Sequence, residues 1–466
     1  MQKYKPNLSS YAFLNFKHFI MKTKQILQYF LLLGLFMTSC TSIERYESPV
    51  TTLSTKSSFD NIFALSEKEV VLRASHFFEE LAKSGKENVE TRSISSMNLN
   101  MKTPVVKTII RTIRYSEDDI ELVPVYVINY TDSRSKVAGG FIVMIGDKRL
   151  NTVLAYSDSG SWGDEDAIMQ NFANLFWINV DELIKNELAG KSLYLKTKSG
   201  DPCEYNIEQA FYDNAKRLVQ PAIWSQLDPY NWKLGLRSSS CPPHQQVSSY
   251  WAVGCWATAM GQIMAYHKKP TSGSYTNYLG QTINATYTWN TMLTSQYISS
   301  LSSQGKEMVQ NLLAQIGHQM VLNTYGYYVP LMSYGCAGSN SDMPKARAGF
   351  AAMGYTTAPT GFDYSYNAVS SEIYANRPVA ARDEYSGTVH PFTDHAWVMD
   401  GVNHQMVVET TVKYCPNQSP TVVGTNVYYI DYVYCNLGAE IPSNWNGYYL
   451  SNIFPPNRVA ILTNIQ

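Results

Sequence analysis

The chain has 466 residues, which is more than one typical domain requires and enough for two. Its formal net charge is −1, so charge gives no indication of binding to nucleic acid or to an anionic membrane surface. Charged residues make up only 16% of the chain and tyrosine occurs 34 times, which argues against disorder and is typical of a β-rich extracytoplasmic protein.

The first forty residues have the order of a secretion signal. A basic stretch begins at Met21, an apolar run covers residues 26–36, and the segment closes at Cys40. The run is too short to span a membrane. Small residues ahead of Cys40 resemble a bacterial lipobox, whose cysteine is lipidated and becomes the mature N-terminus; the alternative is an ordinary signal peptide with an incidental cysteine. We therefore assign residues 1–40 to a signal segment, with Met21 as the more natural start.

Residues 41–215 are expected to form a tether followed by an α+β domain. The tether covers residues 41–60, which are rich in serine and threonine. Hydrophobic periodicity then predicts helices over 66–86, 164–188 and 206–219 and strands within 102–128 and 140–157.

A single cysteine, Cys255, opens the best-defined helix of the remaining sequence. Apolar residues recur behind it at three- and four-residue spacing as far as His267, Gly254 before it permits a sharp turn, and Pro270 ends the run. At a helix N-terminus, the dipole and the unpaired backbone N–H groups favour the thiolate form of a cysteine, which is the nucleophile. Cys255 is therefore the candidate nucleophile, and the alternative is an inert core cysteine.

The candidate base is His395. It lies in a stretch over 393–402 that alternates like a half-buried strand and is expected to end in a turn at Asp400-Gly401. A histidine within reach of a thiolate takes up and returns the proton during acyl transfer.

Two amide side chains complete the candidate site. Asn436 ends a second predicted strand, over 427–434, where it would orient the imidazole ring. Gln226 lies 255 − 226 = 29 residues before the cysteine and would donate to an oxyanion together with the Cys255 backbone N–H.

The other elements of this half suggest its architecture. Helices are predicted over 304–322, 344–353 and 370–376, and mainly strands and turns over 379–462. Helices followed by an antiparallel sheet indicate an α+β arrangement in this half of the chain.

These blocks together resemble the streptopain-like cysteine peptidases, a bacterial branch of the papain-like clan. The likeness rests on Trp-x-Gln-x-x-Pro-Tyr-Asn at 224–231, Gly-Cys-x-Ala-Thr-Ala-Met at 254–260, Asp-His-Ala-Trp-Val-x-Asp-Gly at 394–401 and Asn-Gly-Tyr-Tyr-Leu at 446–450. The interval of 395 − 255 = 140 residues between cysteine and histidine lies within the roughly 130–150 of papain-like enzymes. A fifth block, Gly139–Trp162, resembles the inhibitory propeptide of these zymogens.

The resemblance implies an α+β fold. A papain-like catalytic domain, with a helical lobe and an antiparallel β-sheet lobe, would cover residues 216–466, and the α+β propeptide domain would lie within 41–215. It also implies the catalytic roles given above to the cysteine, histidine, asparagine and glutamine. Family members usually follow the asparagine with Trp-Gly-Trp-Gly-Gly, in which the first tryptophan shields the Asn–His hydrogen bond. Here Leu437 follows it, and the Cys435 thiol precedes it.

The remaining cysteines are odd in number for an oxidising compartment: Cys203, Cys241, Cys336, Cys415 and Cys435. Cys203 lies near the expected propeptide boundary and would be lost on maturation, so that the other four pair or stay reduced. No CxxC spacing or paired histidines indicates a metal site, and no cofactor is expected.

The leading hypothesis is a secreted cysteine endopeptidase, made as a zymogen and acting through a thiolate–imidazolium pair. Its partners would be protein substrates, its own propeptide as an intramolecular inhibitor and, through lipid on Cys40, a membrane; maturation would cut between about Asp201 and Ala222. We expect an exported lipoprotein at the outer membrane or cell surface, with release after maturation as an alternative. An inactive surface protein that binds host or nutrient proteins, and an acyl-transferring enzyme, stay open as other functions.

Overall fold

The computed structural model describes residues 63–466 with gaps at 85–101, 117–118, 133–137, 151, 164–169, 192–202, 219–221, 242–247, 323–324, 326, 337, 359–360, 384–394 and 439–444. The expected signal segment, the lipobox cysteine Cys40 and the tether over 41–60 lie outside the described residues. No helix in the described part of the chain is long and apolar enough to cross a membrane.

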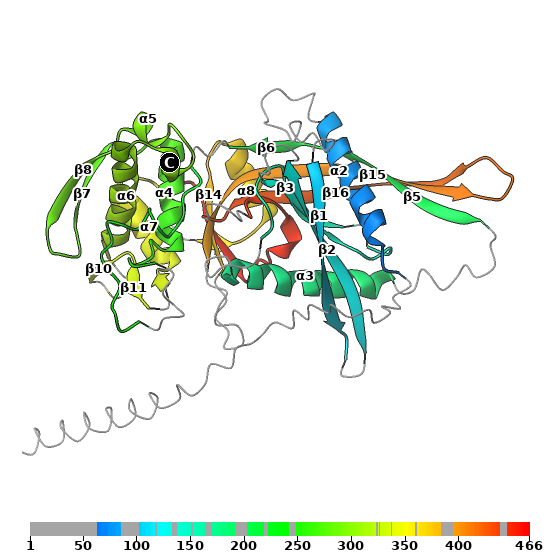
Figure 1. Ribbon diagram of the computed structural model, residues 1–466, viewed down its shortest axis with the longest axis horizontal. Helices are drawn as coiled ribbons and strands as arrows, with labels where there is room; N and C mark the ends of the chain where they lie inside the picture. Colours follow the sequence, from blue (N-terminus) through cyan, green and yellow to red (C-terminus); the bar gives the residue numbers. More distant parts are fainter. Residues whose placement is uncertain are drawn as a thin grey trace, which may run out of the picture. The chain divides into compact units, whose positions relative to one another are not determined.

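The N-terminal part (residues 63–191) is an antiparallel meander with a helix at each end (Figure 1). Helix α2 (Glu67–Ser84) precedes strands β1 (Lys102–Arg114), β2 (Ile120–Asp132), β3 (Ala138–Ile145) and β4 (Val153–Ser157), and helix α3 (Gln170–Lys191) follows them. Ser66 and Glu69 form a capping box at the start of α2, because each side chain accepts a hydrogen bond from the backbone N–H of the other. The helices predicted over 66–86 and 164–188 and the strands predicted within 102–128 and 140–157 are confirmed for the residues that the structure describes.

A second part is mainly helical. Its helices are α4 (Cys255–His267), α5 (Trp289–Met292), the 3-10 turn η5 (Ile298–Ser300), α6 (Ser303–His318), α7 (Met343–Ala352) and α8 (Tyr366–Tyr374), and its hairpins are β7–β8 (Ser272–Thr276 and Thr282–Thr286), β9–β10 (Met320–Leu322 and Tyr328–Pro330) and β11–β12 (Ser333–Gly335 and Gly338–Asn340). α4 packs against α6 and buries every residue from Trp256 to Ala265.

The helix predicted over 304–322 is wrong for its last residues. α6 ends at His318, and residues 320–322 form strand β9, in which Met320 is 47% exposed instead of buried. The carbonyls of Gly317 and Gln319 accept hydrogen bonds from the N–H groups of Met332 and Leu331. Pairing with a later segment of the chain therefore replaces the last helical turn.

One large antiparallel sheet connects the N-terminal part to the rest of the described chain. Its order is β1-β2-β3-β4-β17-β16-β15-β14-β18-β13, and β5 and β6 also pair with β15. The strands not yet introduced are β5 (Glu204–Tyr212), β6 (Ala215–Arg217), β13 (Phe362–Asp363), β14 (Val379–Asp383), β15 (Ala396–Tyr414), β16 (Thr421–Asn436), β17 (Gly447–Leu450) and β18 (Val459–Leu462), with the 3-10 turn η6 (Ser451–Ile453) between the last two. The junction is the β4–β17 pair, in which Tyr156 lies opposite Tyr448.

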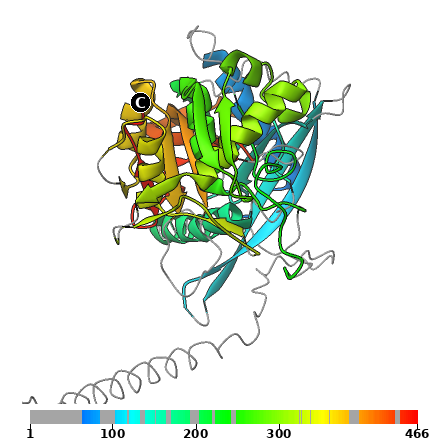
Figure 2. The same ribbon diagram turned by 90° about the vertical axis from the view of Figure 1, so that its left-hand side faces the viewer.

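Two hydrophobic cores lie on opposite faces of β15. Trp397 and Met399 belong to a core that they share with the N-terminal part, whereas Ala396 and Val398 belong to the core around α4. α3 runs along one face of the sheet (Figures 1 and 2), and α4 packs on β14 and β15. The fold is thus α+β, with a helical lobe and an antiparallel β-sheet lobe as expected.

A helix is predicted over 206–219, but the described residues of this stretch form strand β5 to Tyr212 and strand β6 over Ala215–Arg217 instead. β5 pairs with β15 from Glu204↔Tyr414 to Tyr212↔Met406, and β6 pairs with the same strand from Ala215 to Arg217. The spacing of Phe211, Ala215 and Leu218 suits a helix locally. The edge of β15 overrides it, because a paired strand satisfies the backbone of the whole segment.

The turn predicted at Asp400-Gly401 is also wrong. β15 continues through both residues, and its register with β16 shifts between Met399 and Gly401, which is a β-bulge. A Cβ on Gly401 would lie 2.9 Å from the Cβ of Tyr434 and 3.2 Å from Cγ of Arg217, so a glycine lets the neighbouring strands close on both sides. Asp400 is fully buried, and burial raises the pKa of its carboxyl to about 7.

Four of the remaining cysteines form disulfides, Cys203–Cys415 and Cys241–Cys336, while Cys435 is not disulfide-bonded. The first disulfide joins the residue before β5 to the residue after β15. A cut on the C-terminal side of Cys203 would therefore leave the two pieces covalently linked. The expectation that maturation removes Cys203 holds only if this bond is reduced.

Candidate active site

Cys255 is the first residue of α4, as predicted. Gly254 caps the helix at a φ of 91°, a left-handed conformation that favours glycine, and its carbonyl accepts hydrogen bonds from the backbone N–H and the hydroxyl of Thr258, each 3.0 Å long. A Cβ on Gly254 would also collide with Met332 Cε. Cys255 is partly exposed, whereas the ten residues after it are buried. The sulfur thus lies at the positive end of a fixed helix.

A hairpin lies directly beside this turn. The Ser339 hydroxyl, on β12, donates a 2.6 Å hydrogen bond to the Ala252 carbonyl, and a Cβ on Gly254 would lie 3.1 Å from the Ser339 Cβ. β12 therefore packs against the turn that precedes Cys255.

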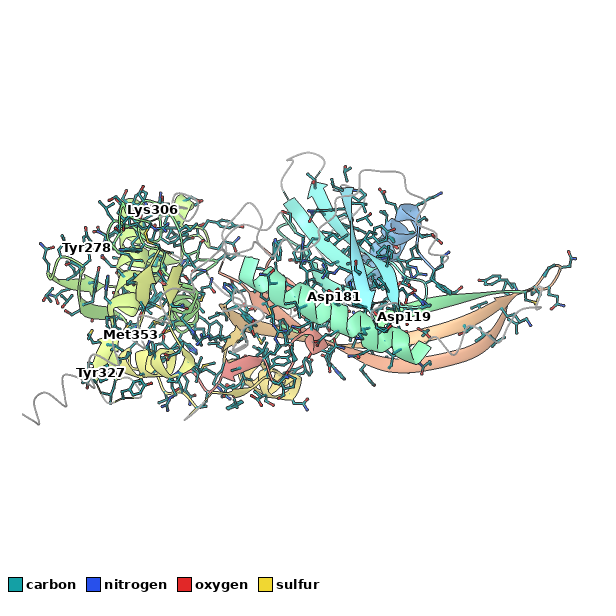
Figure 3. The ribbon with its side chains drawn as sticks, turned by 90° about the horizontal axis from the view of Figure 1, so that it is seen from below. Asp119, Asp181, Tyr278, Lys306, Tyr327 and Met353 are labelled. Carbon is teal, nitrogen blue, oxygen red and sulfur yellow. A yellow bond between two sulfur atoms is a disulfide. The ribbon has the colours of Figure 1, made fainter. Side chains whose placement is uncertain are left out.

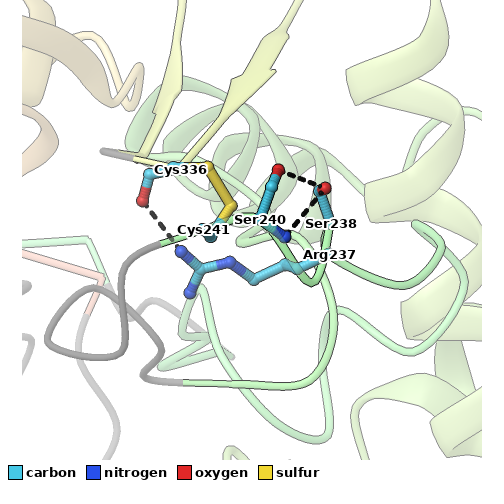
Figure 4. Close-up of a disulfide and its surroundings, with 5 residues drawn as sticks. All are labelled: Arg237, Ser238, Ser240, Cys241 and Cys336. Atoms are coloured by element: carbon cyan, nitrogen blue, oxygen red, sulfur yellow. Dashed lines mark hydrogen bonds between the residues drawn. A yellow bond between two sulfur atoms is a disulfide. The ribbon is translucent and has the colours of Figure 1, made fainter.

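The Cys241–Cys336 disulfide holds the same hairpin at the residue that directly follows β11 (Figure 4). Arg237 Nη2 donates a 2.8 Å hydrogen bond to the Cys336 carbonyl, and the Arg237 N–H bonds to the Ser249 carbonyl on the chain that leads to Cys255. One wall of the site is therefore cross-linked to the segment that carries the nucleophile.

Gln226 also lies next to the segment that carries Cys255. The Val253 N–H donates a 2.9 Å hydrogen bond to the Gln226 carbonyl, and the Gln226 side chain is only 9% exposed. Two residues earlier, the Trp224 carbonyl accepts a 3.1 Å hydrogen bond from Gln262 Nε2 on α4. These bonds fix the Gln226 backbone within two residues of Cys255.

His395 immediately precedes β15 and is 3% exposed. The Asp383 N–H donates to its backbone carbonyl at 3.0 Å, and its ring Nε2 lies 3.1 Å from the carbonyl oxygen of Leu437. A carbonyl only accepts, so this bond places the proton on Nε2 and leaves Nδ1 as the basic nitrogen of the neutral ring. Because α4 packs on β15, the fold brings the segment of His395 to the helix of Cys255.

The hydrogen bonds seen for the Asn436 side-chain amide go to groups other than the His395 ring. Its Oδ1 accepts from Gln262 Nε2 at 3.2 Å and from the Gly438 N–H at 3.4 Å, and its Nδ2 donates to the Ala222 carbonyl at 3.3 Å. The orienting group seen at the imidazole is thus a backbone carbonyl, next to the residue predicted for that role. Gln262, two helical turns after Cys255 on α4, supports this arrangement, and the sequence reasoning gave it no role.

Leu437 takes part through its backbone. Its N–H donates a 2.8 Å hydrogen bond to Asn446 Oδ1, and its side chain is fully buried. The neighbouring Cys435 is buried in apolar surroundings, and this burial raises the pKa of its thiol well above the usual value. Cys435 therefore stays a neutral thiol and adds no second thiolate.

The N-terminal part covers the histidine. The ring of Phe172, on α3, lies 6.4 Å from the ring of His395, 5.5 Å from Trp397 and 5.2 Å from Tyr449. The Phe172 side chain is fully buried. An apolar side chain from outside the helical and sheet lobes thus occupies the surface next to the candidate base.

Further contacts continue along the same surface. Trp162 stacks on Trp445 with ring centroids 4.2 Å apart, and Arg458 Nη1 donates a 3.3 Å hydrogen bond to Asn179 Oδ1 on α3. Figure 3 shows α3 from below, with Asp181 labelled; this residue forms a two-bond ion pair with Arg111 of β1, which ties α3 to the meander. In the part of the chain that the structure describes, no cluster of histidine, cysteine, aspartate and glutamate has the composition of a metal site.

Comparisons with known proteins match two separate parts of the chain to two families. Residues 224–449 match the peptidase C10 family, and residues 63–183 match the Spi protease inhibitor family. Streptopains of Streptococcus pyogenes serotypes M28 and M1 are each 25% identical to this chain over 377 residues, covering 74% of it and 81% of their own length.

Two solved structures from Prevotella intermedia are also similar. A fragment of an alanine variant of prointerpain A is 19% identical, with a TM-score of 0.44, over 77% of this chain and 98% of the fragment. The active wild-type cysteine protease interpain A is 20% identical, with a TM-score of 0.35, over 53% of this chain and 94% of its own.

Proposed function

We propose that the chain is a streptopain-like cysteine endopeptidase with an inhibitor-like propeptide domain, in which Cys255 and His395 form the catalytic pair. The observation that carries this proposal is the position of Cys255 at the capped N-terminus of α4, a helix that packs on the strand led by His395. The helix dipole favours the thiolate, and an imidazole that keeps its proton on Nε2 offers Nδ1 to accept the proton of the thiol.

The proposed reaction follows from these groups. The Cys255 sulfur attacks the peptide carbonyl and His395 returns its proton to the leaving amine, after which water, deprotonated by the same imidazole, hydrolyses the acyl-enzyme. The backbone N–H of Cys255 and the Gln226 side-chain amide stabilise the oxyanion. The hydrogen bond between the Val253 N–H and the Gln226 carbonyl supports this assignment, because it holds the two segments together. Asn436 and the Leu437 carbonyl act as positioning groups for the ring.

We propose that the prodomain (residues 63–191) keeps this site latent through α3. Phe172 packs on His395, and the β4–β17 pair makes the prodomain sheet continuous with the catalytic sheet. The fully buried Phe172 ring occupies the space beside the imidazole for as long as the prodomain is in place. Removal of the prodomain then activates the enzyme toward protein substrates.

Export and lipid attachment at Cys40 also belong to the proposal. The support is the order of the N-terminal segment: a basic start, a short apolar run and a lipobox-like end. The two disulfides fit an oxidising compartment, where such bonds persist. Labelling of the expressed chain with a fatty acid, and loss of the label in Cys40→Ser, tests this part separately.

The test of the catalytic pair compares two cysteines of the same domain. Cys255→Ala should abolish hydrolysis of labelled casein and alkylation at this position, whereas Cys435→Ala, which changes the buried thiol, should keep both. Product masses show whether water or an added amine accepts the acyl group, which separates hydrolysis from acyl transfer. Turnover by Cys255→Ala comparable to that of the parent enzyme would reject the mechanism.

A further inference from the structure

Three strands form an arm that extends away from the rest of the sheet (Figures 1 and 3). It consists of β5, the second half of β15 and the first half of β16. Cys203–Cys415 links the start of β5 to the end of β15, at the far end of the arm. A cross-link there restricts fraying, so the arm presents its outer edge as a preformed strand.

The outer edge of the arm belongs to β16. On one side β16 pairs with β15 along its length, and on the other it pairs with β17 only from Tyr432 to Cys435. Among the residues that the structure describes, no strand lies against that second side over Thr421–Asp431. The backbone N–H and C=O groups that point outward there are available to another strand.

This edge lacks the charged side chains that often protect an edge strand, although β16 has one residue more than β15 at Val423, a β-bulge within the open stretch. Residues 416–430 contain no Asp, Glu, Lys, Arg or His, and every residue from 416 to 427 is exposed. Exposed apolar side chains lie along the strand: Val422 60%, Val423 50%, Val427 52% and Tyr429 58% exposed.

Strand β1, at one end of the same sheet, shows the contrast. Strand β1 carries Lys102, Lys107, Arg111 and Arg114 within thirteen residues, together with Pro104. Charges and proline on an edge strand oppose pairing with another chain. The edge formed by β1 thus carries charges and a proline that the open side of β16 over Thr421–Ile430 lacks.

We propose that β16 pairs antiparallel with β16 of a second copy of this chain, about a two-fold axis at Thr425. This register places Val423 opposite Val427 of the other copy, Thr421 opposite Tyr429, and Val422 opposite Tyr428. Valine–valine and tyrosine–β-branched pairs are favourable across strands.

The lack of charge selects a second copy over a foreign strand. A two-fold axis sets identical segments against each other, so a charge near the axis meets its own like charge, which is destabilising. A strand that recruits a different protein gains selectivity from charges complementary to its partner. β16 has no such charges from Thr421 to Ile430.

The experiment measures the oligomeric state of the full exported chain carrying Cys255→Ala, which prevents self-cleavage. Sedimentation equilibrium from about 1 to 100 µM should show a monomer–dimer equilibrium. Thr425→Lys should make the chain monomeric over this range, because two lysines then meet on the axis. Val105→Lys is the matched control: it places the same charge at a 57% exposed valine on the β1 edge and should leave the dimer unchanged.

Charge complementation tests the register itself. A mixture of Thr425→Lys and Thr425→Glu should restore dimers that contain one copy of each, although each variant alone is monomeric. Circular dichroism and thermal unfolding of both variants establish that the arm substitutions leave the chain folded. Four results would each overturn the proposal: a monomer at all concentrations, open-ended assembly beyond the dimer, an unchanged dimer in Thr425→Lys, or failure of the mixture to pair.

Discussion

Replacing Phe172 by alanine should weaken the contact that holds the prodomain on the catalytic sheet. The ring is fully buried, and its described aromatic neighbours His395, Trp397, Tyr449 and Phe454 all lie in the catalytic domain. Truncating a buried phenylalanine to alanine costs about 3–5 kcal/mol. Because these neighbours lie across the interface, most of this loss should fall on the association of the prodomain with the sheet.

Hydrogen exchange measures that loss directly. In the uncut Cys255→Ala chain, the amides of β4 and β17 exchange when their ladder opens, so a loss of about 3–4 kcal/mol corresponds to a fall in protection of roughly 10²–10³-fold. Mass spectrometry of peptides that contain residues 153–157 and 447–450 gives the two values.

Phe78→Ala is the matched control for this measurement. Phe78 is equally buried, but its ring neighbours Phe77, Tyr130 and Tyr156 all lie within the prodomain. It should reduce protection inside the prodomain more than at β17. A decrease at β17 below tenfold in Phe172→Ala, or equal decreases at β17 in the two variants, would refute the reasoning.

Two further outcomes follow from buried groups near the site. Gly447→Ala should lower latency and spare the activity of the mature enzyme. The added Cβ would lie 2.6 Å from the Tyr156 carbonyl and 3.1 Å from both Phe141 and Ser157, which all belong to the prodomain. The measurements are the residual activity of the uncut chain and the turnover after maturation, and an equal loss of mature activity would contradict the prediction. Asp400→Asn should weaken a pH dependence of stability. Burial raises the pKa of the Asp400 carboxyl to about 7, so this group lowers the stability of the parent protein as pH rises from about 4 to 7. Urea unfolding of both proteins across this window should show a smaller loss of stability in the variant than in the parent.

The parts of the fold that local sequence determines were predictable. The helix behind Cys255 is marked by a glycine cap, by apolar spacing and by Pro270, all within sixteen residues of one another. β5 was not predictable in this way, because its partner β15 begins almost two hundred residues later and its own spacing suits a helix. Pairing over such a distance leaves no periodicity in a local window.

The residues of the candidate site also differ in whether the sequence could predict them. Cys255, His395 and Gln226 are recognisable from side-chain type and spacing, and the fold brings their segments together. The partner seen at the imidazole is the Leu437 carbonyl, which every residue type possesses, so no sequence pattern could have identified it. Phe172 likewise looks like an ordinary core residue of α3 until the catalytic sheet lies against it.

The alternation of β15 between two cores has a consequence for mutational scans of this enzyme. Positions 396 and 398 face the helix of the nucleophile, so substitutions there should impair the mature enzyme, whereas positions 397 and 399 face the prodomain side and should mainly alter its release. The bulge at Asp400-Gly401 shifts this parity by one residue, which returns Val402 to the face of Trp397. Before the bulge, substitutions at even positions should therefore affect the mature enzyme and those at odd positions the release of the prodomain. After the bulge, even positions face the prodomain side instead.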